Sequence, residues 1–93
     1  MTTLIAFHEV ADVDHWLSSP RRGEFFGPLG VTVRTFRDME NSNRTGLNSN
    51  RTGLILDVPD MAAFQEAMES EAAADAMKFD GVRPETLVIL AEA

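Results

Sequence analysis

Residues 3–17 read TLIAFHEVADVDHWL, and this stretch decides the fold because its periodicity changes halfway along. Its first half is a compact apolar run, which is typical of a β-strand. Asp12 then suits a helix N-cap, and Val13, Trp16 and Leu17 recur at the spacing of one helical face. The stretch therefore predicts a strand that is followed directly by a helix.

The same two patterns alternate along the rest of the chain. Further strands are expected over residues 31–37, 54–58 and 86–90, which are rich in β-branched and other apolar side chains. Helices are expected to begin after Asp60 and to run over residues 71–79. The resulting order, βαββαβ, predicts an α+β, ferredoxin-like fold with a four-stranded antiparallel sheet.

The last predicted strand gives a reason to expect a homodimer. Residues 87–90 are consecutive apolar residues, which is typical of a strand buried on both faces. With helices on one face of the sheet, a chain of 93 residues has no further element to cover the other face. Two copies that pack sheet against sheet would bury it, so we expect one domain, 1–93, that forms a dimeric α/β barrel.

Residues 41–47 read NSNRTGL, and residues 48–54 repeat the same letters. We interpret segment 41–54 as a tandem duplication, natural or engineered, in the hairpin between the second and third strands. Seven is an odd number, so an insertion within a strand would turn every later side chain to the wrong face. Either the extra copy loops out or, as we favour, Arg44–Leu47 pair with Arg51–Leu54 in a longer hairpin.

Composition excludes several classes of function. The net charge of −7 argues against nucleic acid and against an anionic membrane as partners, because both need a basic surface. The chain has no cysteine, no glycine-rich phosphate loop and no acidic residues spaced to join its two histidines at a metal. We therefore expect no metal and no cofactor. Without a signal peptide or a long apolar run, a cytoplasmic location is expected.

Several segments together carry a resemblance to a known family. They are residues 8–16, Gly30, Arg37-Asp38, Val58-Pro59-Asp60 and residues 77–82. On these segments the chain resembles the dimeric α/β-barrel superfamily, which includes cofactor-free monooxygenases of aromatic polyketides, polyketide cyclases, lactone isomerases and haem enzymes. The resemblance implies the fold and dimerisation and leaves the activity open. The chain has no tyrosine, a residue that those monooxygenases often use, which argues against that activity.

His8 and Arg34 are the candidate catalytic residues. His8 alternates with apolar residues on one strand face, where it would act as a general base, hold an anion or serve only the structure. Arg34 shares a strand face with Phe36. If that face lines a cavity, Arg34 would clamp a carboxylate or an enolate oxygen; otherwise it would pair with an acid such as Asp57.

Trp16, Phe36 and Phe64 are the candidates for the wall of a ligand pocket, although aromatic residues at such spacing often belong to the core. Arg21 and Arg22 are expected to face solvent. Three functions stay open. The first is a small dimeric α/β-barrel protein whose biochemical role the sequence leaves open, in an engineered or variant form with a duplicated loop. The second is a cofactor-independent monooxygenase or cyclase of an aromatic polyketide-like ligand. The third is a ligand-binding or regulatory module without catalysis. Whether it is an enzyme is left open.

Overall fold

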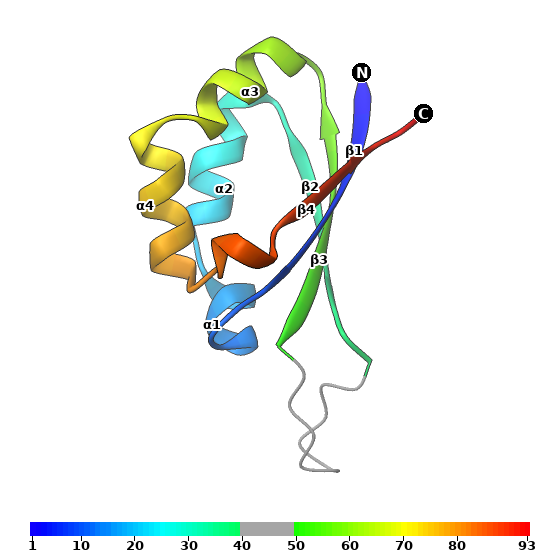
Figure 1. Cartoon of the computed structure of the whole chain (residues 1–93). Helices are drawn as coiled ribbons and strands as arrows, with labels where there is room; N and C mark the ends of the chain where they lie inside the picture. The colour runs from blue at the N-terminus through cyan, green and yellow to red at the C-terminus, as the bar shows by residue number, and fades with distance from the viewer. Residues whose placement is uncertain (40–49) are drawn as a thin grey trace.

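A computed structural model describes residues 1–39 and 50–93. These residues form a four-stranded antiparallel sheet of order β2-β3-β1-β4, with helices on one face (Figure 1). The elements are β1 (Thr2–Glu9), α1 (Val13–Ser18), α2 (Arg21–Phe26), η1 (Gly27–Leu29), β2 (Thr32–Arg37), β3 (Arg51–Val58), α3 (Met61–Met68), α4 (Glu71–Asp80), η2 (Pro84–Thr86) and β4 (Val88–Ala91). The predicted α+β, ferredoxin-like architecture is confirmed, with each helical segment split in two.

The helices begin and end at residues with clear physical reasons. Asp12, Asp60 and Ser70 cap α1, α3 and α4, each accepting a hydrogen bond from the backbone N–H three residues later. Pro20 lies between α1 and α2, as expected from its missing N–H. Gly81 ends α4 with φ of 74°, a left-handed conformation that glycine adopts without strain.

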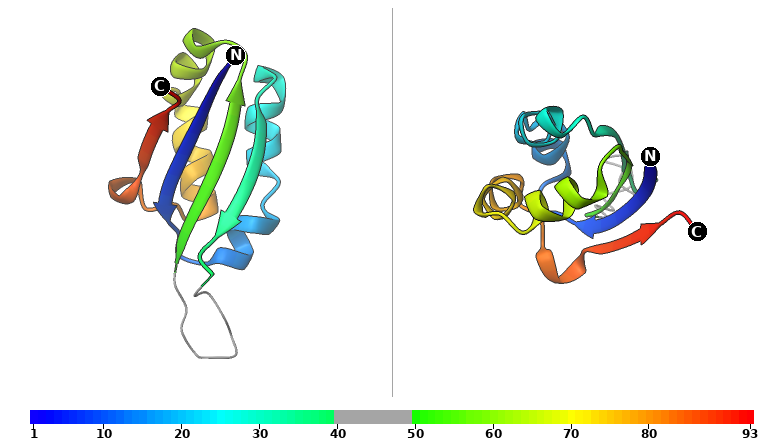
Figure 2. Two further views of the ribbon diagram at one scale, coloured as in Figure 1. Left: turned by 90° about the vertical axis from the view of Figure 1, so that its right-hand side faces the viewer. Right: turned by 90° about the horizontal axis from the view of Figure 1, so that it is seen from above.

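The two faces of the sheet differ completely in their environment. Alternate residues of β1 and β3 point towards the helices and are buried there, Leu4, Ala6, Leu54, Leu56 and Val58 among them. The helices cover this face of the sheet, as the two views of Figure 2 show. Because successive side chains of a strand point to opposite faces, the residues between these lie on the uncovered side.

The uncovered side, which we call the open face, carries Ile5, Phe7, Phe36, Val88 and Leu90. Each is between 39% and 52% exposed. Phe7 pairs with Val88 and Ile5 with Leu90 across β1 and β4, so these four side chains are contiguous. The prediction that the last strand is buried on both faces is wrong for a single chain, because β4 is an edge strand whose residues are all exposed.

The second copy of the repeat supplies the first residues of β3. Thr52 and Gly53 pair with β1 on one side and with β2 on the other, and Leu54 does the same. Both edges of this segment are therefore occupied, and the expected pairing of Arg44–Leu47 with Arg51–Leu54 is wrong. The second copy, rather than the first, begins β3 because only the second copy is followed directly by residues 55–58. The first copy and residues 48 and 49 lie outside the described residues.

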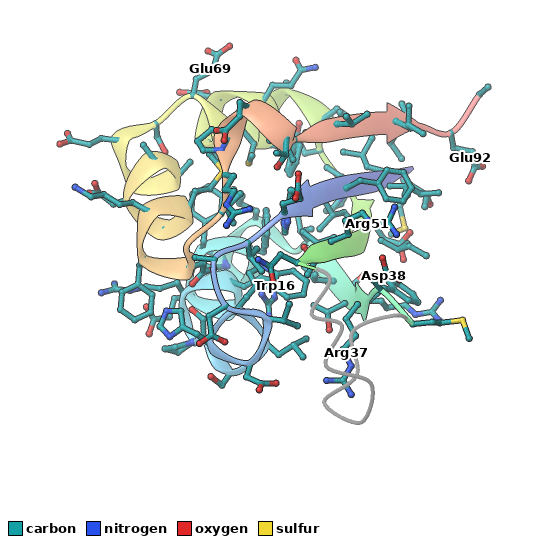
Figure 3. The ribbon with its side chains drawn as sticks, turned by 60° about the horizontal axis from the view of Figure 1, so that its bottom comes forward. Trp16, Arg37, Asp38, Arg51, Glu69 and Glu92 are labelled. Carbon is teal, nitrogen blue, oxygen red and sulfur yellow. The ribbon has the colours of Figure 1, made fainter. Side chains whose placement is uncertain are left out.

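An ion pair joins β2 and β3 at the end where the repeat begins. Nη2 and Nε of Arg51 lie 2.6 and 2.7 Å from Oδ2 of Asp38, and the N–H of Asp38 donates to the carbonyl of Arg51 at 3.1 Å (Figure 3). On the opposite side of this end, Val10 N–H donates to Asn50 O at 3.0 Å. These contacts hold the start of β3 in register with both of its neighbours.

Candidate functional site

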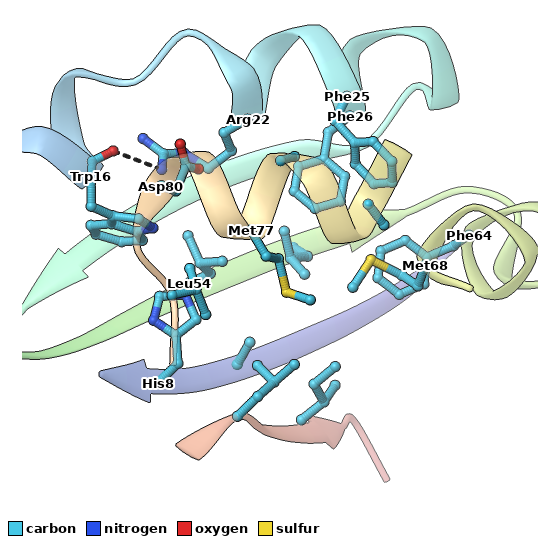
Figure 4. A pocket seen from close by; sticks show the side chains of 17 residues that line it. His8, Trp16, Arg22, Phe25, Phe26, Leu54, Phe64, Met68, Met77 and Asp80 are labelled. Atoms are coloured by element: carbon cyan, nitrogen blue, oxygen red, sulfur yellow. Dashed lines mark hydrogen bonds between the residues drawn. The ribbon is translucent and has the colours of Figure 1, made fainter. Parts of the chain in front are cut away.

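A pocket of about 70 Å³ lies between the helices and the covered face of the sheet. Figure 4 shows that its residues are segregated. His8, Arg22 and Asp80 gather beside Trp16 and form what we call the polar end. The opposite, apolar end contains Phe25, Phe26, Phe64 and Met68. A mostly apolar cavity with a few converging polar groups is the usual form of a small-molecule site.

His8 stands at the polar end, near the last residue of β1, and is only 6% exposed. The hydroxyl of Thr52 donates to the carbonyl oxygen of His8 at 2.9 Å and lies 2.6 Å from its Nδ1. We assign the one hydroxyl proton to the carbonyl, so that Thr52 accepts from Nδ1–H and all three groups are paired. In this tautomer the lone pair of Nε2 has no partner among the described residues, and the ring packs edge-on against Trp16 at 5.3 Å between centroids.

The electrostatic surroundings of His8 favour its neutral form. Burial lowers its pKa from 6.5, and this is the largest effect. The hydrogen bond to its own backbone raises the pKa, the positive charge of Arg22 lowers it, and the negative charge of Asp80 raises it. At neutral pH the ring is thus an acceptor and a base, rather than a cation that holds an anion.

Arg22 belongs to this site, and the sequence analysis missed it. Nη1 donates to Trp16 O at 3.1 Å and Nη2 to Leu17 O at 3.4 Å, while the guanidinium carbon lies 4.7 Å from the centre of the Trp16 ring. The side chain caps the C-terminal end of α1, where a cation is favourable. Burial lowers its pKa, and the charge of Asp80 raises it. The prediction that Arg21 and Arg22 both face solvent is wrong for Arg22.

Asp80 is the second residue that the sequence analysis missed. It is the last residue of α4 and is 6% exposed, and its Oδ1 has no hydrogen-bond partner among residues 1–39 and 50–93. A buried acceptor without a partner is destabilising, and the C-terminal end of a helix is the unfavourable end for a negative charge. The fold thus holds a carboxylate oxygen in the pocket at a cost to its stability.

A short bridge fixes His8 and Asp80 relative to each other. Val10 pairs with Val82, and each of these is two residues beyond its site residue. Ala11 N–H donates to Gly81 O, and Arg83 N–H donates to Glu9 O, both at 2.9 Å. A Cβ on Gly81 would lie 3.3 Å from that of Ala11, so only glycine allows this close approach without displacement. The polar end is therefore built on a rigid junction.

The predicted site residues separate into two groups. His8, Trp16 and Phe64 line the pocket. Arg34 and Phe36 do not, because they pair with Ile55 and Gly53 on the open face, with the guanidinium carbon of Arg34 5.5 Å from the centre of the Phe36 ring. The expectation that they would share a pocket with His8 is wrong, since alternation along the strands places them across the sheet from it.

Two further features of the described segments concern possible partners. In residues 1–39 and 50–93, no group of three or more histidine, aspartate or glutamate side chains is placed to hold a metal ion. No helix of these segments has the length and apolar character needed to cross a bilayer.

Comparisons with known proteins agree on the fold. No protein-family model and no curated protein sequence matches the chain. The chain is similar to a solved structure described as an antibiotic biosynthesis monooxygenase, with a TM-score of 0.62 and 14% identity over 100% of this chain and 97% of that one. It is also similar to an ethyl tert-butyl ether d (EthD) family protein from Bacillus halodurans C-125, with a TM-score of 0.54 and 15% identity over 100% and 98% of the two chains. These likenesses show that the chain shares the ferredoxin-like fold with both proteins.

Proposed function

We propose that the protein binds a small aromatic molecule in this pocket and that His8 removes a proton from a hydroxyl group of that molecule. The observation that carries the proposal is the free Nε2 lone pair of a neutral histidine at the polar end of an otherwise apolar pocket. The proton passes from the ligand oxygen to Nε2, leaving a phenolate or enolate and an imidazolium. The charge of Arg22 favours the anion, and that of Asp80 favours the imidazolium.

The size of the pocket limits the ligand to one ring. An apolar cavity of about 150 Å³ holds a benzene molecule, and pockets for drug-sized ligands measure about 300–1,000 Å³. At about 70 Å³, this pocket takes one ring only if some side chains move. Met68 and Met77 line it and are unbranched, so they are suited to such movement. Ile89 also lines it and is 43% exposed, which places its opening beside β4.

The proposal includes a homodimer in which the open face is covered by a second copy. The five side chains Ile5, Phe7, Phe36, Val88 and Leu90 make an apolar patch of the kind that marks an interface. In analytical ultracentrifugation, we expect the wild type to have a molecular mass twice the 10.3 kDa of one chain. Leu90→Arg should yield monomers, whereas Ala72→Arg, an exposed change on α4, should not. A monomeric wild type would disprove this part.

A cofactor-independent monooxygenase is the second candidate function, favoured by the full-length likeness of fold to a protein described as a monooxygenase. In that case dioxygen would be the oxidant, and a ring C–H ortho or para to the phenolate oxygen would become a carbonyl, giving a quinone, with the second oxygen atom released as water. Oxygen consumption separates this candidate from simple proton transfer. A ligand-binding module without catalysis is the third, and a cytoplasmic location remains part of each.

A chromophoric phenol tests the proton transfer directly. The ionised form of 4-nitrophenol is coloured, so its absorbance reports the charge of the bound molecule. We expect binding to lower its apparent pKa by about one unit, and His8→Gln to abolish the shift while leaving binding within a few fold. His15→Gln is the matched control, since His15 is an exposed histidine outside the pocket. The same shift in His8→Gln as in wild type would remove His8 from this role.

A further inference from the structure

The polar end of this pocket presents two acceptor atoms to a ligand, Nε2 of His8 and Oδ1 of Asp80. The Nδ1–H of His8 is taken by Thr52, which leaves Nε2 as an acceptor. Two nitrogens of Arg22 are turned to the carbonyls that end α1. Among the described residues, the buried side-chain polar atom without a hydrogen-bond partner is Oδ1 of Asp80, which is also an acceptor. Two acceptors at one end of a cavity are complementary to two donors on a ligand.

Asp80 cannot resolve its missing hydrogen bond by turning to solvent without local unfolding. It is 6% exposed, and the next residue, Gly81, is held against Ala11 by a backbone hydrogen bond of 2.9 Å. The bridge between Val10 and Val82 holds the chain on the other side of Gly81. The carboxylate is therefore kept in position at the pocket wall, as a group that recognises a ligand should be.

We propose that the ligand is an aromatic diol, whose first hydroxyl donates to Nε2 of His8 and whose second donates to Oδ1 of Asp80. This inference rests on the proposed function and adds the class of ligand to it. The second hydroxyl supplies the partner that the buried carboxylate lacks. A charge-assisted hydrogen bond in a buried site is among the strong ones, and its absence leaves the carboxylate unsatisfied again.

The same arrangement selects against other ring compounds. A ligand with a carboxylate would bring a second negative charge against Asp80, and like charges in a buried site oppose each other. An ether or a quinone would present only acceptors to the two acceptors of the protein. A site built to hydrogen-bond a donor rejects analogues that lack it far more strongly than an apolar pocket rejects a difference in size.

Trp16 provides the probe for a test, because it is the one tryptophan of the chain and it lines the pocket. Quenching of its fluorescence under argon gives the Kd of catechol, resorcinol, phenol, 2-methoxyphenol and benzoate. We expect the better of the two diols to bind at least about tenfold more tightly than phenol. We expect 2-methoxyphenol to bind no more tightly than phenol, and benzoate to bind more weakly than phenol.

Variants of Asp80 locate the source of this preference. In Asp80→Ala the ratio of phenol Kd to diol Kd should fall to within about twofold of one, because one hydrogen bond to a charged acceptor is lost. Asp80→Asn keeps an acceptor oxygen without the charge and should give an intermediate ratio, so it serves if the alanine variant does not fold. Asp75→Asn, an exposed change on the same helix, should keep the wild-type ratio.

The outcomes separate this inference from the proposed function. If phenol binds and is ionised by His8 but neither diol binds more tightly, Asp80 does not select the ligand and the diol inference is overturned. A preference for diols that persists in Asp80→Ala overturns it as well. If none of the five compounds quenches Trp16, the proposed function fails and the inference fails with it.

Discussion

Replacing Asp80 by asparagine should make the protein more stable, which is unusual for a change at a buried residue. Oδ1 of Asp80 has no hydrogen bond to lose. Removing a charge from the C-terminal end of α4 relieves about 0.3–1 kcal/mol of unfavourable dipole interaction. Leaving the buried carboxylate without a hydrogen bond costs about 1–3 kcal/mol more, and the neutral amide of asparagine would still carry part of that cost. The lost attraction to half-buried Arg22 opposes this by up to about 1 kcal/mol.

The net expectation for Asp80→Asn is a gain of about 1 kcal/mol in the free energy of unfolding. For a chain of this length, that raises Tm by about 4–8 °C. Thermal and urea unfolding followed by circular dichroism would measure both, at one protein concentration so that association does not differ between samples. Asp75→Asn is the matched control and should change the free energy by less than about 0.5 kcal/mol.

A lower Tm for Asp80→Asn would refute this reasoning. It would mean that the attraction between Asp80 and Arg22 outweighs both penalties, and that the carboxylate is present for stability. Combining the change with Arg22→Gln would then identify the interaction, because the two effects would no longer add. A gain in stability together with loss of diol preference would show a residue kept for binding at the expense of the fold.

Three further predictions concern stability. Burial lowers the pKa of His8 below 6.5, so on acidification the unfolded chain binds a proton at this residue before the folded chain does. Stability should therefore fall as the pH drops through 6.5, and it should fall less in His8→Gln. Thermal melts from pH 5 to 8 measure this. Gly81→Ala should lower the free energy of unfolding by more than about 1 kcal/mol. Gly23→Ala, in open space on α2, should raise it by about 0.5 kcal/mol, and urea unfolding measures both. Deleting residues 41–47 shortens the connection between β2 and β3, residues 38–50, from thirteen residues to six, a common length for connections in compact domains, and should leave the circular dichroism spectrum unchanged.

Each of these predictions has an outcome that contradicts it. Equal pH dependence in wild type and His8→Gln would assign the titration to another group. A neutral Gly81→Ala would show that the junction with Ala11 is looser than its 3.3 Å Cβ separation implies. A deletion variant that does not fold would show that both copies of the repeat are needed, against the interpretation of the segment as a tolerated duplication.

Local patterns in the sequence predicted the elements because the forces that set them act over a few residues. Asp12, Asp60 and Ser70 cap helices through hydrogen bonds to the backbone three residues away, and this spacing is visible in the sequence. His8 was found for the same reason, since alternation along one strand places it beside buried apolar residues.

The other half of the polar end could not be predicted in this way. Arg22 and Asp80 lie on different helices, and only the turn at Pro20 and the junction after α4 bring them together beside Trp16. Arg34 was misplaced for a related reason. Residues 34–37 of β2 are all exposed, so their pattern does not show which face the helices cover, and only pairing with β3 decides it.

The bridge between Val10 and Val82 holds the polar residues of the pocket in place, whereas other side chains determine the shape of the pocket. His8 and Asp80 are each tied to that bridge, whereas the opposite end is bounded by the side chains of Phe25, Met68 and other residues of three helices. A change of ring size or substituent can therefore be accommodated at that end, by side chains such as those of Phe25 and Met68. Substitutions at that end can therefore alter the size and shape of the pocket while His8 and Asp80 keep their positions.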